Sequence, residues 1–172
     1  MMRIISGIYR GQSLSRIPFQ GTRPTQARVR KSMLQILEPF EGKKVLDLFA
    51  GSGILGIEAL SRGADSLVSI ENDKKIFKIL NNNLIKICKD KSYQPLFMDA
   101  INFLNRCNQK FDIIISDPPY NQYDYMDIFN KSIPLINKGG IFCMEMRKKE
   151  VDENVFRKKI YGNTQIILWE AN

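Results

Sequence analysis

Residues 111–120 read Phe-Asp-Ile-Ile-Ile-Ser-Asp-Pro-Pro-Tyr. Phe111 to Ile115 form a short apolar run rich in β-branched residues, which is typical of a strand buried on both faces of a parallel sheet. The two prolines that follow lack a backbone N–H and cannot extend an inner strand, so the strand ends before them. Ligands of open α/β folds bind at this carboxyl edge of the sheet. The segment therefore predicts an α/β fold with a binding site at residues 117–120.

These four residues offer the groups that a planar amine needs. The Asp117 carboxylate and the Pro118 carbonyl are two acceptors for the hydrogens of one amino group, because Pro119 has no N–H to occupy that carbonyl. Tyr120 adds an aromatic face on which a base can stack. The lone pair of such an amine is delocalised into its ring, so catalysis would rest on positioning. The alternative is a stiff loop in which Asp117 caps a turn.

Length and hydropathy limit the architecture. The 172 residues suffice for one α/β domain with a small appendage, which we place at residues 44–172 and 1–43. No apolar run approaches the ~18–20 residues of a membrane span, and residues 1–10 lack the apolar region of a secretory signal. We therefore expect a cytoplasmic protein without a membrane partner.

The chain contains no histidine, which excludes histidine-based nucleophilic catalysis, acid–base relays and metal sites. Its three cysteines, Cys88, Cys107 and Cys143, are widely spaced and match no zinc-binding pattern. We interpret them as reduced core thiols rather than as disulfides or nucleophiles. The sequence predicts no metal.

Most of the net charge of +8 lies at the N-terminus. Residues 1–44 carry nine basic and two acidic side chains, whereas residues 45–172 carry 17 basic and 16 acidic ones. No acidic residue precedes Glu38. This segment favours contact with a polyanion over the alternative of an ordinary charged surface.

Periodicity and turn residues predict the order of the elements. We expect a basic hairpin over residues 2–17 and a helix that begins at Pro24-Thr25. We then expect strands at 45–49, 66–70, 93–98, 111–115 and 141–146, helices at 54–61, 73–88, 101–107 and 123–136, a turn at Gly139-Gly140, and a terminal hairpin of 156–161 and 164–170.

A glycine-rich turn follows the first of these strands. Gly51-x-Gly53-x-x-Gly56, with Glu71 after the next strand, has the form of a nucleotide-binding fingerprint in which the carboxylate accepts ribose hydroxyls. Asp47 lies inside an apolar strand, where a carboxylate is costly unless it serves a partner. It would repel a pyrophosphate but attract an amino group and a sulfonium. Asp47 therefore favours S-adenosylmethionine over a nicotinamide dinucleotide.

The chain resembles class I S-adenosylmethionine-dependent methyltransferases and, among them, the bacterial 16S ribosomal RNA (guanine-N2)-methyltransferase family. The resemblance rests on residues 2–11, 23–30, 46–64, 117–120 and 161–162. Asp-Pro-Pro-Tyr and the glycine motif are shared by many amino-methyltransferases, whereas the basic N-terminal signatures and the run Ser61-Arg62-Gly63-Ala64 are more specific. Ser6 and Ile8 depart from the usual glycine and lysine beside Gly7.

The resemblance implies a Rossmann-like, seven-stranded mixed sheet of order 3-2-1-4-5-7-6 and a hairpin-helix extension that engages 16S rRNA, in a monomer that methylates one guanine with S-adenosylmethionine. The candidate catalytic residues are Asp117, Pro118, Pro119 and Tyr120. The candidate donor contacts are Asp47, Phe49, Ala50, Gly51, Ser52, Gly53, Glu71, Asn72, Asp99 and Ala100. The candidate RNA contacts are Arg3, Tyr9, Arg10, Arg16, Arg23, Thr25, Arg28 and Arg30.

Several alternatives stay open at this point. Asp99 either reaches the adenine amino group or caps a helix. The enzyme could be an adenine-N6 methyltransferase; a protein glutamine methyltransferase is disfavoured because those families carry Asn before Pro-Pro-Tyr. A non-catalytic RNA-binding ribosome assembly factor is a third reading. A nicotinamide oxidoreductase is disfavoured, since the chain has neither histidine nor a Tyr-x-x-x-Lys pair.

Overall fold

The computed structural model describes residues 2–18 and 24–172. Its main sheet has the strand order β5-β4-β3-β6-β7-β9-β8, and β9 pairs antiparallel with both β7 and β8. The strands are β3 (Lys44–Asp47), β4 (Ser66–Glu71), β5 (Ser92–Phe97), β6 (Phe111–Ser116), β7 (Ile136–Arg147), β8 (Arg157–Tyr161) and β9 (Thr164–Glu170). Counted from β3, this is the order 3-2-1-4-5-7-6, so the predicted topology is confirmed.

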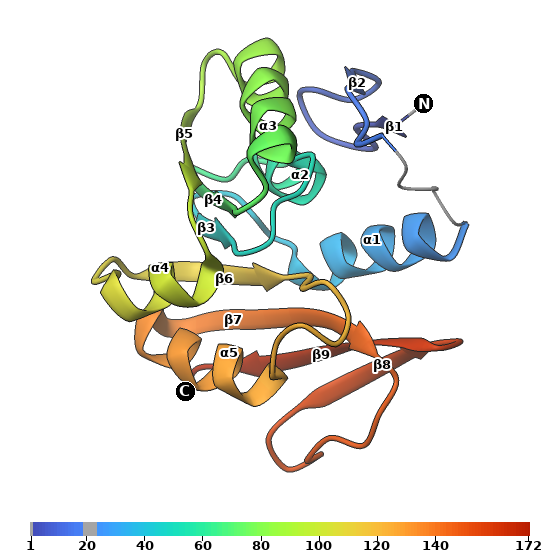
Figure 1. Ribbon diagram of the computed structural model, residues 1–172, viewed down its shortest axis with the longest axis vertical. Helices are drawn as coiled ribbons and strands as arrows, with labels where there is room; N and C mark the ends of the chain where they lie inside the picture. Colours follow the sequence, from blue (N-terminus) through green and yellow to red (C-terminus); the bar gives the residue numbers. More distant parts are fainter. Residues whose placement is uncertain (1, 19–23) are drawn as a thin grey trace.

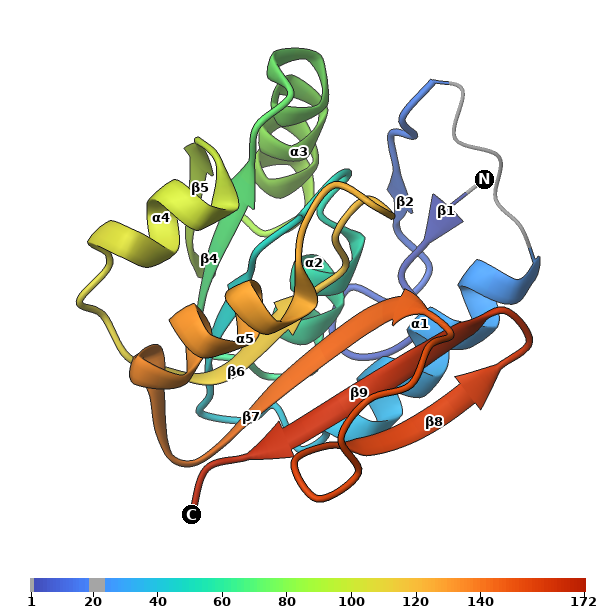
Figure 2. The same cartoon turned by 60° about the horizontal axis from the view of Figure 1, so that its bottom comes forward.

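Helices cover both faces of the sheet (Figures 1 and 2). On one face lie α1 (Pro24–Leu37), α2 (Ile54–Ser61) and α3 (Lys74–Ile87). On the other lie α4 (Ala100–Arg106) and α5 (Tyr125–Ser132), which continues into a 3-10 turn, η1 (Ile133–Leu135). No helix in the described part of the chain is long and apolar enough to cross a membrane.

Each inner strand is apolar on both faces because two cores lie against it. In β6, Ile113 and Ile115 belong to the core under α1, α2 and α3, whereas Ile114 belongs to the core under α4 and α5. Alternate side chains of a strand point to opposite faces. The continuous apolar run of β6 is therefore explained by helices that cover both faces of the sheet, as the sequence predicts.

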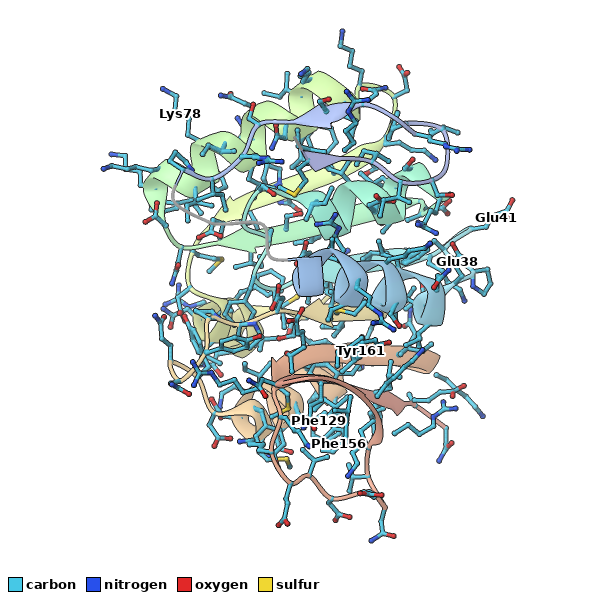
Figure 3. All side chains as sticks on the ribbon, turned by 90° about the vertical axis from the view of Figure 1, so that its right-hand side faces the viewer. Glu38, Glu41, Lys78, Phe129, Phe156 and Tyr161 are labelled. Carbon is cyan, nitrogen blue, oxygen red and sulfur yellow. The ribbon has the colours of Figure 1, made fainter. Side chains whose placement is uncertain are left out.

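The C-terminal strands are anchored to both cores. Phe129 and Phe156 pack edge to face with their ring centroids 4.6 Å apart, and Figure 3 shows them together beside the C-terminal hairpin. On the other face, the Tyr161 hydroxyl is hydrogen-bonded to Ser32 of α1. Aromatic contacts and one helix contact thus position the hairpin next to α1.

The predicted turn at Gly139-Gly140 is present, but it lies inside the span of β7 rather than before the strand. Both glycines lie inside β7, where the register with β6 shifts between Phe111, which pairs with Ile136, and Ile113, which pairs with Ile141. Gly139 has a φ of 71°, and a Cβ on Gly140 would lie 2.8 Å from the carbonyl oxygen of Asp112. The same Cβ would lie 2.9 Å from the Asn137 carbonyl oxygen, so the backbone folds back at the glycines, and regular pairing with β6 resumes at Ile141.

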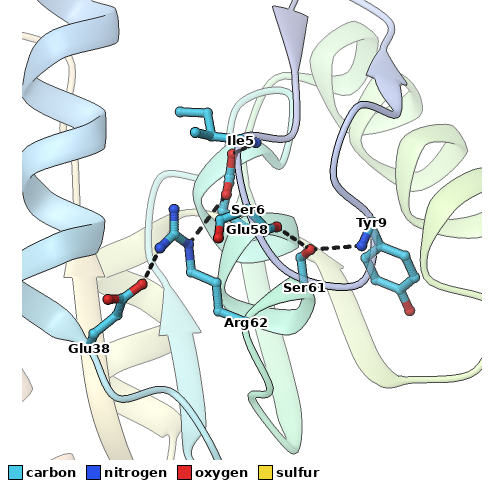
Figure 4. Close-up of polar contacts among 7 residues, drawn as sticks. All are labelled: Ile5, Ser6, Tyr9, Glu38, Glu58, Ser61 and Arg62. Atoms are coloured by element: carbon cyan, nitrogen blue, oxygen red, sulfur yellow. Dashed lines mark hydrogen bonds and ion pairs between the residues drawn. The ribbon is translucent and has the colours of Figure 1, made fainter.

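The N-terminal hairpin, β1 (Met2–Arg3) and β2 (Ser13–Leu14), packs on α2 (Figure 4). Ser61 Oγ donates to the Ser6 carbonyl at 2.6 Å and accepts the Tyr9 N–H at 2.9 Å. Glu58 accepts the Ile5 N–H at 2.6 Å and also pairs with Arg62. The run Ser61-Arg62-Gly63-Ala64 thus includes residues that hold the hairpin on α2. The domain boundary between residues 43 and 44 stays a prediction.

Candidate active site

A cleft of about 1110 Å³ opens at the carboxyl edge of the sheet. One wall carries residues that follow β3, β4 and β6, and the other carries residues of the N-terminal hairpin and α1. The lining includes these predicted site residues: Phe49, Ala50, Gly51, Ser52, Glu71, Asn72, Asp117, Pro118, Pro119, Tyr120, Arg3, Arg16 and Arg30. The fold therefore brings the three predicted groups of residues to one cavity.

The loop between β3 and α2 is shaped by its glycines and held by Glu71. Gly51 and Gly53 have φ values of 55° and 85°, which L side chains rarely adopt. The Glu71 carboxylate accepts the Gly51 N–H at 3.0 Å with one oxygen and the Asp73 N–H at 2.8 Å with the other. A carboxylate has about four acceptor sites, so Glu71 keeps capacity for a ligand.

Asp47 is fully buried at the end of β3, and neither of its oxygens has a hydrogen-bond partner among the described residues. Burial raises the pKa of Asp47 to about 7, and the charge of Glu71 acts in the same direction. Dipoles of the Gly56 and Phe49 amides oppose this rise without forming a hydrogen bond. An isolated buried carboxylate of this kind is suited to a positively charged ligand.

Two further carboxyls belong to this edge of the sheet: Asp117 directly follows β6, and Glu145 lies near the end of β7. Asp117 is accessible from the cleft yet surrounded by protein, and this loss of hydration, with the charges of Glu145 and Asp47, raises its pKa well above the ordinary value. Burial also raises the pKa of Glu145, against the effect of its hydrogen bonds from Tyr120 and Thr164. The cleft is therefore acidic at the end formed by Asp117 and Glu145.

Tyr120 stands at this end with 43% of its surface exposed. Its hydroxyl lies 3.3 Å from Glu145 Oε1 and 3.1 Å from Thr164 Oγ1, and the guanidinium carbon of Arg147 lies 5.1 Å from its ring centroid. Nothing in the sequence singles out Glu145, Thr164 or Arg147 as neighbours of this site. They come from β7 and β9, far along the chain, and no motif marks them.

Asp99 is a helix cap, as the alternative reading has it. Its Oδ1 accepts the Asn102 N–H at 3.0 Å, and its Oδ2 accepts the Tyr123 hydroxyl at 2.9 Å. Tyr123 also packs edge to face on Phe49, with centroids 4.9 Å apart. A small cavity of about 20 Å³ beside it is lined by residues that include Asn72 and Ala100. The adenine contact of Asp99 stays a prediction.

The predicted RNA contacts fall into distinct places. Arg3, Arg16 and Arg30 line the cleft, whereas Arg10 and Arg28 are exposed outside its lining. Burial lowers the pKa of Arg30, whose half-buried guanidinium has an Nε without a hydrogen-bond partner among the described residues.

One of these expectations fails. Tyr9 is only 8% exposed and packs in the core between the hairpin and the helices, which contradicts a direct contact with RNA. Tyr9 lies in the turn between β1 and β2, and its N–H is bound to Ser61 of α2, which places the turn against the helix. Arg23 and the side chain of Thr25 lie outside the described residues.

Comparison with known proteins agrees with this architecture. The family model described as conserved hypothetical protein 95 matches residues 2–170. The chain belongs to this family. The conserved hypothetical protein 95 match includes both the N-terminal and the C-terminal hairpin, so neither is an addition peculiar to this chain.

Three relatives illustrate the likeness. Ribosomal RNA small subunit methyltransferase D of Buchnera aphidicola is 33% identical over 96% of this chain and 91% of its own length. The structure of Escherichia coli yhhF, described as a candidate methyltransferase, superposes with a TM-score of 0.88 at 29% identity, over 99% of this chain and 98% of its own.

The third relative shares the fold alone. The Thermus thermophilus 16S rRNA N2 G1207 methyltransferase RsmC, in complex with AdoMet and guanosine, gives a TM-score of 0.72 at 21% identity. It covers 91% of this chain and 45% of its own. Together the three relatives establish the methyltransferase fold of this member of the conserved hypothetical protein 95 family.

Proposed function

We propose that this protein transfers a methyl group from S-adenosylmethionine to the exocyclic N2 of a guanine in 16S ribosomal RNA, as a cytoplasmic monomer. The observation that carries the proposal is the cleft itself. It joins the Asp-Pro-Pro-Tyr motif to three arginines of the N-terminal extension, above a buried carboxylate without a partner. The names of the relatives, ribosomal RNA small subunit methyltransferase D among them, support the same substrate.

The residues present fit a cationic methyl donor. Asp47 has no partner of its own, and a sulfonium and amino group nearby would compensate its charge. Glu71 would accept ribose hydroxyls, and the backbone of Gly51 to Gly53 would lie along the ligand. Asn72 and Ala100 would contact its base. When bound, S-adenosylmethionine supplies an electrophilic methyl group on sulfur.

Asp117 and the Pro118 carbonyl orient the acceptor nitrogen. By accepting the two hydrogens of guanine N2, they hold its lone pair toward the methyl group. Positive charge develops on this nitrogen during transfer, and the Asp117 carboxylate stabilises it. Because its pKa is raised, Asp117 is a stronger base than an ordinary carboxylate and is suited to accept the proton that N2 releases.

The other wall of the cleft would hold the RNA. Arg3, Arg16 and Arg30 would contact phosphates on either side of the extruded guanine. The exposed ring of Tyr120 would then stack on the base, which is worth roughly 1–3 kcal/mol. The guanidinium of Arg147 already lies over this ring, so the ring face is accessible to flat groups.

Transfer of labelled methyl from S-adenosylmethionine to unmodified small-subunit particles, free ribosomal RNA and DNA, with nucleoside analysis, tests the proposal. We expect N2-methylguanosine in the ribosomal sample. The Asp117→Ala variant should bind the donor yet lose transfer, whereas Asp65→Asn, which removes an exposed carboxylate, should behave as wild type. Full turnover by Asp117→Ala would refute the mechanism. Label in adenine would favour the N6 alternative, and RNA binding without transfer would favour an assembly factor.

A further inference from the structure

Glu145 occupies a position in the cleft that the methyl transfer described above does not use. Strand β6 pairs in parallel with β7, with Ser116 opposite Met144. The next residues, Asp117 directly after β6 and Glu145 within β7, therefore lie side by side. Such strands lie about 4.8 Å apart, and paired residues point to the same face. That face is shared with Asp47, which pairs with Ile115. Two carboxyls therefore stand next to each other where the acceptor base would bind.

The two oxygens of Glu145 have different surroundings. Oε1 accepts a hydrogen bond from the Tyr120 hydroxyl at 3.3 Å and lies 3.3 Å from Thr164 Oγ1, which donates at 2.8 Å to the Met146 carbonyl oxygen. Within residues 2–18 and 24–172, Oε2 has no hydrogen-bond donor, and it is not among the fully buried unpaired atoms. Glu145 is 7% exposed and lines the cleft. One oxygen is therefore fixed by the protein, and the other remains available to a ligand.

Holding the Tyr120 hydroxyl in place does not require a negative charge on Glu145. A neutral glutamine has the same shape and an oxygen that accepts the hydrogen bond from the Tyr120 hydroxyl equally well. Burying a carboxylate without full compensation costs several kcal/mol, so the acid at this position is explained by a donor that reaches it from the cleft.

We propose that Glu145 determines base specificity by accepting the N1–H of the target guanine through Oε2, while Asp117 and the Pro118 carbonyl hold N2. The inference rests on the proposed function. In guanine a ring N–H lies directly beside the amino group, so adjacent carboxylates meet adjacent donors. In adenine and cytosine the ring nitrogen beside the amino group is an acceptor, which a carboxylate repels. Reading a flipped base along this edge is how such sites discriminate.

The experiment uses an RNA fragment that carries the guanosine methylated by the wild-type protein, and a second fragment with 2-aminopurine at that position. 2-Aminopurine keeps the amino group on C2 but has an acceptor at N1. The proteins are wild type, Glu145→Gln, and the control Glu150→Gln, which changes an exposed carboxylate of the segment after β7. Each is assayed for kcat/KM on both fragments and for affinity toward S-adenosylmethionine.

We expect the wild type and Glu150→Gln to prefer guanine over 2-aminopurine. Glu145→Gln should lose about 10–100-fold in kcat/KM on guanine, the worth of one hydrogen bond to a charged group. Its preference for guanine should fall by a similar factor, because the glutamine amide can donate to the N1 acceptor. The affinity of Glu145→Gln for S-adenosylmethionine should be unchanged.

Three results would overturn the inference. The first is equal loss by Glu145→Gln on both fragments, which indicates a structural role. The second is weaker donor binding with an unchanged preference, which assigns Glu145 to the donor. The third is equal methylation of both fragments by the wild type, a measurement that needs no variant to fold. Absence of N2-methylguanosine from the wild-type reaction would instead refute the proposed function.

Discussion

Replacing Asp47 by Asn removes a charge and leaves the shape of the side chain, so its effect isolates the cost of burying the carboxylate. Asp47 is fully buried without a hydrogen-bond partner among the described residues, and its pKa rises from 3.8 to about 7. At about 1.4 kcal/mol for each pKa unit, this difference corresponds to about 4 kcal/mol in favour of the neutral form.

The sign follows from proton linkage. The pKa of Asp47 is higher in the folded than in the unfolded chain, so the folded protein binds the proton more tightly. The contribution of Asp47 to the free energy of unfolding is therefore most favourable below about pH 4, falls as the pH rises toward about 7, and then levels off. The neutral amide of the Asp47→Asn variant behaves like the protonated acid throughout. This variant should match the wild type near pH 4 and exceed it by up to about 4 kcal/mol at pH 8.

Thermal unfolding between pH 4 and pH 8 checks this expectation. For a chain of this length the gain at pH 8 corresponds to a Tm increase of about 8–16 °C. S-Adenosylmethionine should reverse the order, since it supplies the charge that Asp47 lacks and should stabilise the wild type more than the variant. Asp65→Asn serves as the exposed control. A Tm difference independent of pH, or equal stabilisation of both proteins by the ligand, would refute the reasoning.

Three further predictions concern the cleft and the hairpin. Tyr120→Ala should lower kcat/KM on RNA by about 10–100-fold, whereas Tyr120→Phe, which keeps the stacking face, should lose far less; equal losses would argue against stacking. Arg30→Ala should weaken RNA binding and reduce the slope of log K against log salt by about 1, with donor affinity unchanged; an unaltered slope would remove Arg30 from the phosphate contacts. Gly7→Ala should destabilise the protein more than the roughly 1–3 kcal/mol expected of Ser61→Ala, because a Cβ on Gly7 would lie 1.8 Å from the Ser61 carbonyl oxygen; urea unfolding measures both, and a mild Gly7→Ala would contradict the close packing.

The sequence predicts the helices and strands well where local patterns are strong. Helix α2 has the predicted bounds, and the predicted helix over residues 73–88 includes α3 with its capping residues, because Asp73 accepts the N–H groups of Lys75 and Ile76. Such signals involve residues only a few positions apart. These local signals therefore determine the helices independently of contacts made elsewhere in the chain.

Distant parts of the chain explain what the local residues leave open. Tyr9 belongs to the basic hairpin that is expected to contact RNA, but the hairpin packs on α2 and buries the ring of Tyr9. The turn at Gly139-Gly140 is predicted by its glycines, whereas its position inside the span of β7 is set by pairing with β6 and by hydrogen bonds with Ala171. In both cases a partner distant in the sequence decides the arrangement.

The residues around the cleft show what the sequence determines and what the tertiary structure determines. The sequence by itself determines the α/β order of elements, the glycine loop, the Asp-Pro-Pro-Tyr motif and the isolated acid Asp47, since each depends on residues adjacent in the chain. Only the tertiary structure places Arg30 in the same cleft as Tyr120 and sets Glu145 beside Asp117. These neighbours come from separate elements, and no local pattern encodes their distance. Sheet pairing and helix packing, which act between elements remote in the chain, are what bring them together.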